Sequence, residues 1–211
     1  MTWRHAGRIA GNGAVLVLAS ACAGARQPTP SSDPVVRARA DSVRNPYTAA
    51  DIQFMTGMIH HHGQAIAMSK LAPANGATPS VRTLAARIIN AQTDEISLIQ
   101  QWLRERRQPA PEPNPAGMRM VMGGVEHDML MPGMLTDAQM KELESAKGGD
   151  FDQRFLELMI YHHRGAVAMV KELLDSRGAA LDETVFKLAA DISADQQTEI
   201  GRMQQMLIVR D

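Results

Sequence analysis

The sequence predicts an all-α protein in which two copies of a helical hairpin form a four-helix bundle. An internal repeat is the first reason, because residues 51–68 recur as 152–169 and residues 81–103 recur as 185–207. Apolar residues in all four stretches also follow the three- and four-residue spacing of a helix with one buried face. A long connection joins the copies, which indicates a ferritin-like crossover.

The expected elements follow in order along the chain. The first hairpin is expected at 48–106, the crossover at 107–149 and the second hairpin at 150–208. The turns inside each hairpin are short, so the paired helices should run antiparallel. A capping-box motif at 136–139 predicts a short helix within the crossover.

Residues 1–21 are expected to be a cleaved export signal, with a basic start and an apolar run too short to span a membrane. The single cysteine, Cys22, follows directly and indicates a lipidated N-terminus, with ordinary cleavage beside it as the alternative. Residues 22–44 are polar and rich in proline and serine, which predicts a disordered linker to the bundle domain at 45–208. We therefore expect an exported protein, held in the cell envelope by lipid and facing the periplasm or the outside.

Composition and motifs favour a single helical domain and argue against a nucleic-acid-binding protein or an enzyme. The chain of 211 residues is 45% hydrophobic, which suffices for one helical domain with its own core. The net charge of -1 favours no nucleic-acid partner, and a homo-oligomer stays open. No serine or cysteine nucleophile arrangement is present, and neither Glu95 nor Glu199 begins the Glu-x-x-His motif of di-iron bundles. We therefore expect a protein that is not an enzyme.

Two His–His pairs and two glutamates are expected on or beside the inward faces of the four helices: His61, His62, His162, His163, Glu95 and Glu199. Their distances from the hairpin turns put them at similar heights, so the duplication would gather them around a pseudo-twofold axis. Such a group predicts one of two things. It is either a buried hydrogen-bonded network that fixes the register of the helices, or a metal site with neutral imidazole ligands.

Fifteen methionines are an unusually high number for 211 residues. Four lie beside the histidine motifs, as core residues or as thioether ligands: Met58, Met68, Met159 and Met169. The crossover holds a second group with one histidine: Met118, Met120, Met122, His127, Met129, Met131 and Met134. Alternating methionines cannot all face one helical core, and exported thioethers suit Cu(I) or Ag(I). The alternative is a loop that buries its methionines against the bundle.

Three motifs carry a resemblance to a known family. They are Met58-Ile59-x-His61-His62-x-x-Ala65-x-x-Met68, its copy Met159-Ile160-x-His162-His163-x-x-Ala166-x-x-Met169, and Met131-Pro132-Gly133-Met134-Leu135. The sequence resembles the bacterial family called domain of unknown function 305 over roughly residues 45–208. This resemblance implies a ferritin-like four-helix bundle, usually exported, with some members binding copper in the periplasm. It also implies that the four motif histidines and the motif methionines are the functional residues.

The functional hypothesis is an exported metal-binding lipoprotein that binds or buffers copper in the cell envelope, with zinc and iron left open. The alternative is a non-catalytic structural or interaction protein of the envelope, in which the histidines serve only the stability of the bundle. The expected partners are a metal ion and a membrane, the latter through a lipid on Cys22.

Overall fold

The computed structural model describes residues 33–44 and 46–209, so the expected signal segment and Cys22 lie outside the described residues. The helices are α1 (Pro34–Arg44), α2 (Ala49–Lys70), α3 (Pro79–Glu105), α4 (Asp137–Ser145), α5 (Gly148–Asp175) and α6 (Glu183–Ile208). Two antiparallel strands, β1 (Met118–Met122) and β2 (Val125–Met129), lie between α3 and α4 in the sequence. The prediction of a mostly helical fold is confirmed. Within the described residues, no helix is both long enough and apolar enough to cross a membrane.

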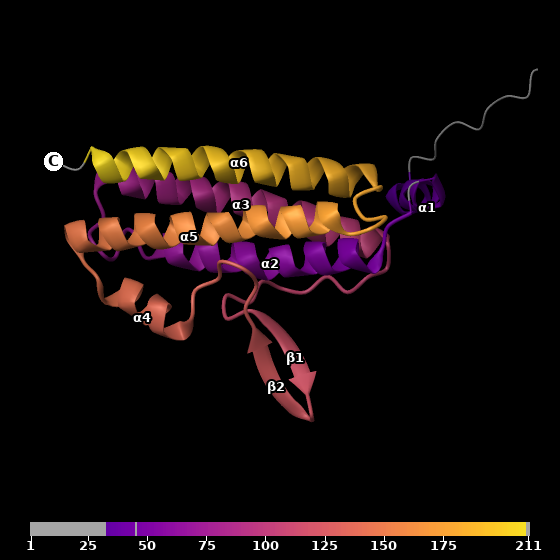
Figure 1. The fold of residues 1–211 in the computed structure, drawn as a ribbon, viewed down its shortest axis with the longest axis horizontal. Coiled ribbons are helices and arrows are strands. Elements are labelled where there is room, and N and C mark those ends of the chain that lie inside the picture. The colour runs from indigo at the N-terminus through magenta and orange to yellow at the C-terminus, as the bar shows by residue number, and fades with distance from the viewer. Residues whose placement is uncertain (1–32, 45, 210–211) are drawn as a thin grey trace, which may run out of the picture. The chain divides into compact units, whose positions relative to one another are not determined.

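The four long helices lie side by side (Figure 1). Helix α2 pairs with α3, α5 pairs with α6, and α2 also packs against α5. A capping box starts α2, in which the Thr48 hydroxyl accepts a hydrogen bond from the Asp51 N–H at 3.3 Å. Helix α6 starts after Asp182, whose carboxylate accepts hydrogen bonds from two N–H groups of the first turn. Each copy of the repeat therefore forms one helical hairpin.

Two apolar clusters fill the interior, and a polar layer separates them. On α2, Phe54 and Met58 belong to one cluster and Met68 to the other, with His61 between them in the sequence. On each of the other long helices, too, polar residues separate a stretch in one cluster from a stretch in the other. These polar residues form what we call the polar layer: His61, His62, Gln92, Glu95, His162, His163, Gln196 and Glu199. The polar residues of the repeat thus lie near the middle of all four long helices.

Two equivalent aspartates tie each hairpin to the turn of the other. Asp51 on α2 accepts a hydrogen bond at 2.7 Å from the N–H of Ala180, in the turn of the second hairpin. Asp152 on α5 accepts hydrogen bonds at 3.2 Å from the N–H of Thr78, in the turn of the first. The sequence repeat is therefore expressed as a pair of reciprocal contacts.

We expect Asp51→Ala to lower the free energy of unfolding by about 3 kcal/mol, because hydrogen bonds to an ionised acceptor contribute about 1.5–3 kcal/mol each. Asp51 is fully buried and also accepts from the Thr48 N–H at 2.6 Å. Asp152→Ala is the matched comparison, and its loss should be smaller because its contacts are longer. Urea unfolding of both variants measures the difference. An equal or larger loss for Asp152→Ala would contradict the prediction.

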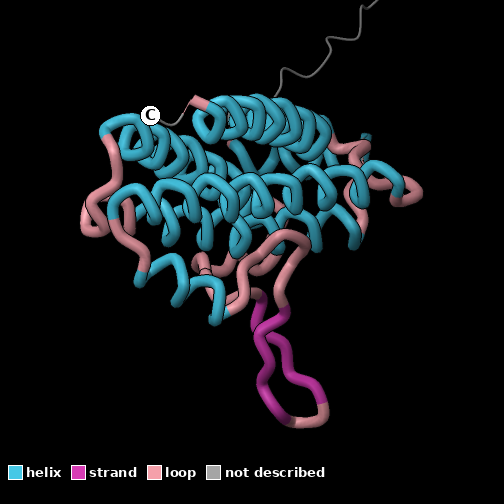
Figure 2. The backbone as a smooth tube through the Cα atoms, turned by 60° about the vertical axis from the view of Figure 1, so that its left-hand side comes forward, coloured by secondary structure: helices cyan, strands magenta, loops and turns pink. Residues whose placement is uncertain are grey.

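The crossover differs from the expected loop because its methionine-rich part is a β-hairpin. The prediction of the short helix is confirmed by α4, which begins with a capping box at Thr136. The alternation of methionines with other residues is the two-residue period of a strand. Gly123 and Gly124 connect the strands with φ values of 60° and 82°, which suit the two-residue turn of a tight hairpin. Figure 2 shows the hairpin projecting away from the helices.

The expected disordered linker at 22–44 is wrong in its second part, since Pro34–Arg44 form α1. Proline is favoured at a first helical position, and the Asp33 carboxylate accepts a hydrogen bond from the Val35 N–H at 2.8 Å. Ala38 is buried, and α1 contacts α3. Local capping and this contact therefore order a segment whose composition is typical of a linker.

Candidate metal centre

The four motif histidines lie at the centre of the polar layer. His61 and His62 come from α2, His162 and His163 come from α5, and none of the four side chains is exposed to solvent. The periodicity of each helix explains this, because neighbouring histidines near the middle of a helix point about 100° apart and both meet the interior. The prediction that His61 and His162 point inward agrees with the structure, and His62 and His163, expected at the flank of that face, are buried as well.

The outer histidines each meet a glutamate of the partner helix in the same hairpin. His62 Nε2 lies 2.6 Å from Glu95 Oε2, and His163 Nε2 lies 2.6 Å from Glu199 Oε2. The two glutamate side chains are 16% and 22% exposed, so the carboxylates connect sealed imidazoles with the protein surface. The two contacts repeat the internal symmetry of the sequence.

The inner histidines contact each other across the interface between the hairpins. The ring centroids of His61 and His162 are 3.9 Å apart with an interplanar angle of 39°. His61 Nε2 lies 3.0 Å from the carbonyl oxygen of Pro132, which can only accept. His61 Nε2 therefore carries the proton, and Nδ1 has a free lone pair. His162 lies beside the main chain of His61, but neither of its ring nitrogens makes a well-formed hydrogen bond.

Burial keeps both inner imidazoles neutral. Loss of solvation, and then the neighbouring His62, lower the pKa of His61 to about 3. Burial, and then the closeness of His61, hold the pKa of His162 well below its usual range. A neutral imidazole is the form that binds a metal ion, so no proton has to be displaced at neutral pH.

Unsatisfied polar atoms are concentrated in the polar layer. Twelve buried side-chain nitrogen and oxygen atoms in the described residues lack a well-formed hydrogen bond, and ten of them belong to this layer. They come from His61, His62, Gln92, Glu95, His162, His163 and Gln196. Two of these ten, His62 Nε2 and Glu95 Oε2, contact each other at 2.6 Å, which leaves eight. Each such group costs about 1–3 kcal/mol when it stays unpaired, so the polar layer lowers the stability of the fold unless a further polar group or an ion completes it.

Three carboxylates lie where the polar layer approaches the surface. Partial burial, and then the charges of Glu95 and Glu199, raise the pKa of Asp195 on α6. The three groups are therefore close enough to repel one another, and they produce a negative potential at this surface.

The centre offers donor atoms without a completed ligand set. Among the described residues, no group of three or more His, Cys, Asp and Glu side chains is arranged to hold a metal ion. The two inner imidazole rings are tilted by 39° to each other at a centroid distance of 3.9 Å. The prediction that these residues lie together agrees with the structure, and their ligation of a metal stays a prediction.

The predicted methionine ligands fall into three groups. Met58, Met68 and Met159 are fully buried in the apolar clusters, as expected for core residues. Met134 is also buried, whereas Met120 and His127 are exposed on the hairpin, and Met122 belongs to β1. The remaining four line one cavity between the hairpin and the long helices: Met118, Met129, Met131 and Met169.

Sequence reasoning missed the residues that hold the crossover over the centre. The Gln64 amide donates to the carbonyls of Pro115 at 2.8 Å and Leu135 at 2.9 Å, and accepts from the Leu135 N–H at 2.6 Å. His60 Nδ1 accepts from the Asn114 N–H at 3.1 Å. The signal was a departure from the repeat, because Gln64 corresponds to Gly165 and His60 to Tyr161. The two copies differ because the crossover contacts them differently. It hydrogen-bonds to His60 and Gln64 of the first copy and packs its backbone against Gly165 of the second.

Fold and site together define a class of mostly helical proteins in which a duplicated histidine layer is covered by a methionine-rich crossover. The chain belongs to the family described as a domain of unknown function, DUF305, which matches residues 51–207. No curated protein has significant sequence similarity to the chain.

Several solved structures are similar to this chain over most of their length. A DUF305 protein of Streptomyces coelicolor, thought to be secreted, is 31% identical, covers 75% of this chain and 92% of its own, and has a TM-score of 0.61. A DUF305 fragment of Deinococcus radiodurans is 29% identical, with 76% and 97% covered and a TM-score of 0.61. CopM in its Cu(I)-bound form is 28% identical, with 74% and 94% covered and a TM-score of 0.55. Its Cu(II)-bound, silver-bound and apo forms are also similar.

Proposed function

We propose that this protein binds copper at the polar layer and buffers it in the cell envelope, without a catalytic step. One observation carries the proposal: with the His62–Glu95 contact set aside, eight buried polar atoms of this layer lack a well-formed hydrogen bond. Copper suits imidazole donors, and the copper-bound and silver-bound forms of CopM support the choice of metal.

The residues that would hold the ion are His61 and His162, with His62 and His163 beside them. The carboxylates of Glu95 and Glu199 are already engaged with the outer histidines, so the free donors are mostly neutral. A monovalent ion costs less to bury among neutral donors than a divalent one, which favours Cu(I) over Cu(II) and Zn²⁺. The protein's part is to keep the imidazoles neutral, sealed from water and close together.

Export and architecture complete the proposal. Residues 1–21 have the pattern of an export signal, and a similar protein of the family is thought to be secreted. We infer that Cys22 is lipidated and that the four long helices belong to the ferritin-like class of bundles. The anchor would keep the copper site in the envelope, facing the periplasm or the outside.

Removing the inner histidine pair should weaken copper binding at this centre by at least about 100-fold, since even outer-shell partners of a metal are worth about 10–100-fold in affinity. The variant is His61→Leu/His162→Leu, which keeps side-chain bulk but removes the ring nitrogens. Chelator competition with Cu(I) under anaerobic conditions, and separately with Cu(II), measures the affinity. X-ray absorption of the Cu(I) protein should report nitrogen ligands that the variant lacks.

His127→Leu is the matched control, because His127 is exposed on the hairpin. Its nitrogen-ligated copper should bind as in the unaltered protein. If His61→Leu/His162→Leu keeps the nitrogen-ligated copper, or if His127→Leu loses it, the polar layer is not the copper site.

The histidine–glutamate contacts favour a second candidate function, a structural or interaction protein of the envelope. His62 with Glu95 and His163 with Glu199 can fix the register of each hairpin without any ligand. That function predicts an unchanged melting temperature on adding Cu(I), and an effect of His61→Leu on stability alone. A rise in melting temperature with Cu(I) that disappears in His61→Leu/His162→Leu decides against it.

A further inference from the structure

We propose that a second site, separate from the histidines, binds Cu(I) through the thioethers of Met118, Met129, Met131 and Met169. This inference rests on the proposed copper function. It adds a second site, in which Cu(I) is bound by thioether sulfur instead of imidazole nitrogen. The ligand class is a soft monovalent cation, for which thioether sulfur is a suitable donor.

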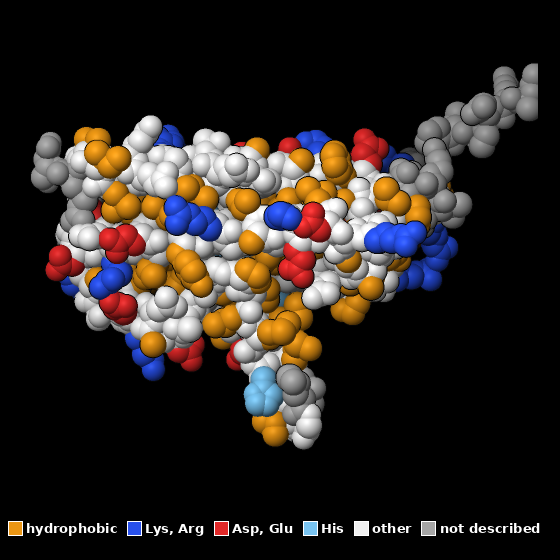
Figure 3. Space-filling view, in the orientation of Figure 1, with side chains coloured by type: hydrophobic (Ala, Val, Ile, Leu, Met, Phe, Trp, Pro, Cys, Tyr) orange, Lys and Arg blue, Asp and Glu red, His pale blue; other side chains and the backbone are white. Residues whose placement is uncertain are grey.

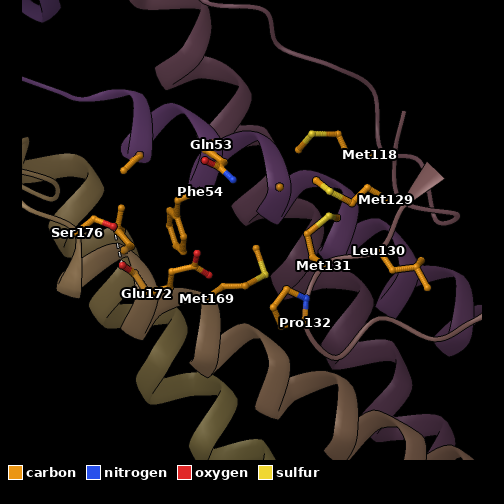
Figure 4. A pocket seen from close by; sticks show the side chains of 13 residues that line it. Gln53, Phe54, Met118, Met129, Leu130, Met131, Pro132, Met169, Glu172 and Ser176 are labelled. Atoms are coloured by element: carbon orange, nitrogen blue, oxygen red, sulfur yellow. Dashed lines mark hydrogen bonds between the residues drawn. The ribbon is translucent and has the colours of Figure 1, made fainter. Parts of the chain in front are cut away.

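The site is a cavity of about 200 Å³ at the base of the β-hairpin. Its four methionines come from β1, β2, the following loop and α5. Figure 4 shows the side chains of Met118, Met129 and Met131 close together, with Met169 facing them from α5. Tertiary structure therefore joins methionines that the sequence places in two unrelated groups.

Strand register brings the two hairpin methionines together. Met118 is directly opposite Met129 in the antiparallel pair, so both side chains lie on the same face of the hairpin. Both residues line the cavity because they stand at the end of the hairpin that joins the long helices. The Met-x-Met alternation is thus the two-residue period of a strand, and strand pairing places Met118 beside Met129.

A glycine on α2 brings the other two methionines together. A Cβ at Gly57 would lie 3.3 Å from Met169 Cε and 3.6 Å from Met131 Cγ. The missing side chain leaves room for both methionines over the same point of the helix. Gly57 also lines the cavity, so Met131 and Met169 meet over the part of the cavity wall that this glycine forms.

Packing alone does not account for this set. Met131 is 8% and Met169 7% exposed, whereas Met129 is 42% exposed, so the group extends from the interior to solvent. Figure 3 shows hydrophobic side chains gathered where the hairpin meets the long helices. Glu172 also lines the cavity, and no lysine or arginine does. Soft donors, one carboxylate and access from solvent together suit a cation.

The two sites are neighbours through one short segment. Pro132 lines the thioether cavity, and its carbonyl oxygen accepts the hydrogen bond of His61. The methionines and the polar-layer histidines are nevertheless separate sets of donors, so each can be removed without removing ligands of the other.

Methyl resonances test the proposal without any substitution. The protein is labelled with [methyl-¹³C]methionine and titrated with Ag(I), a diamagnetic stand-in for Cu(I). We expect shifts of the Met118, Met129, Met131 and Met169 methyls. Met120, exposed on the hairpin, and Met203, buried in the other cluster, should stay unchanged. Absence of shifts in the four methyls, or equal shifts in Met120, would overturn the proposal.

Variants separate this site from the histidine centre. Met131→Leu/Met169→Leu nearly conserves volume and should remove the sulfur-ligated Cu(I) equivalent, seen by X-ray absorption, while the nitrogen-ligated equivalent stays. His61→Leu/His162→Leu should do the reverse, and Met120→Leu should change neither. If the methionine variant keeps its sulfur ligands, the cavity is not a copper site. If only the nitrogen-ligated copper is absent from the unaltered protein, the histidine proposal fails and the thioether site stands.

Discussion

Acidification of the copper-free protein from pH 7 to pH 4.5 is expected to lower its free energy of unfolding by about 3 kcal/mol through His61 alone. The pKa of His61 is about 3 in the folded protein, against 6.5 for an unperturbed histidine. Between these two values the unfolded chain binds the proton and the folded protein does not. Stability is therefore complete above pH 6.5 and is lost progressively as the pH falls towards 3.

His162 adds to this loss, since its pKa is lowered in the same direction. The measurement is urea unfolding at several pH values between 7 and 4.5, with a chelator present. His61→Leu/His162→Leu should show a much flatter dependence, because it has no buried imidazole pair to protonate. His127→Leu should keep the dependence of the unaltered protein. A variant without the inner pair that is equally acid-sensitive would show that other groups cause the loss.

Gly165→Ala is expected to lower the free energy of unfolding by about 3 kcal/mol or more, at the upper end of the range for overpacked positions. A Cβ at Gly165 would lie 2.0 Å from the Pro132 carbonyl oxygen and 2.5 Å from Gly133 Cα. Both contacts are with the backbone of another segment, so no side chain can rotate away. The crossover has to move, and the Pro132 carbonyl then leaves His61.

Gly201→Ala is the matched control for this prediction. Gly201 lies in α6, and a Cβ there would meet nothing within 4 Å. It should raise stability by up to about 1 kcal/mol, because alanine has the higher helix propensity. Thermal and urea unfolding compare the two variants, and copper titration of Gly165→Ala tests whether the crossover also supports the centre. Similar stabilities for the two variants would contradict the close packing of the crossover on α5.

Much of the fold could be predicted because its causes are local or repeated. Apolar spacing marks the four long helices, and the duplication indicates that their polar residues meet near one level. That reasoning places the glutamates at the height of the histidines, and the structure adds that Glu95 and Glu199 contact His62 and His163. The β-hairpin could have been predicted as well, because Met118 and Met120 alternate in a strand pattern that leads to Gly123-Gly124. Helix α1 was not predicted, because its segment has a composition typical of linkers.

Other parts of the site depend on where the crossover lies. The bond between His61 and the Pro132 carbonyl joins residues that nothing in the repeat connects. The Gln64 amide makes two hydrogen bonds with the main chain of Leu135. Nothing in the sequence indicates which residue a buried glutamine will bind. The contact between the rings of His61 and His162 also depends on the packing of α2 against α5, which periodicity alone does not specify.

The sequence by itself determined the duplicated helical hairpins, the inward histidines and the polar layer between two apolar clusters. These features depend on helical periodicity and on a repeat, and both can be recognised from the order of residues along the chain. Only the tertiary structure decided that Met169 joins Met118, Met129 and Met131 around one cavity, and that the crossover hydrogen-bonds to the first copy of the motif through His60 and Gln64. Such contacts depend on the path of a non-repeated connection across packed helices, and local spacing does not encode that path.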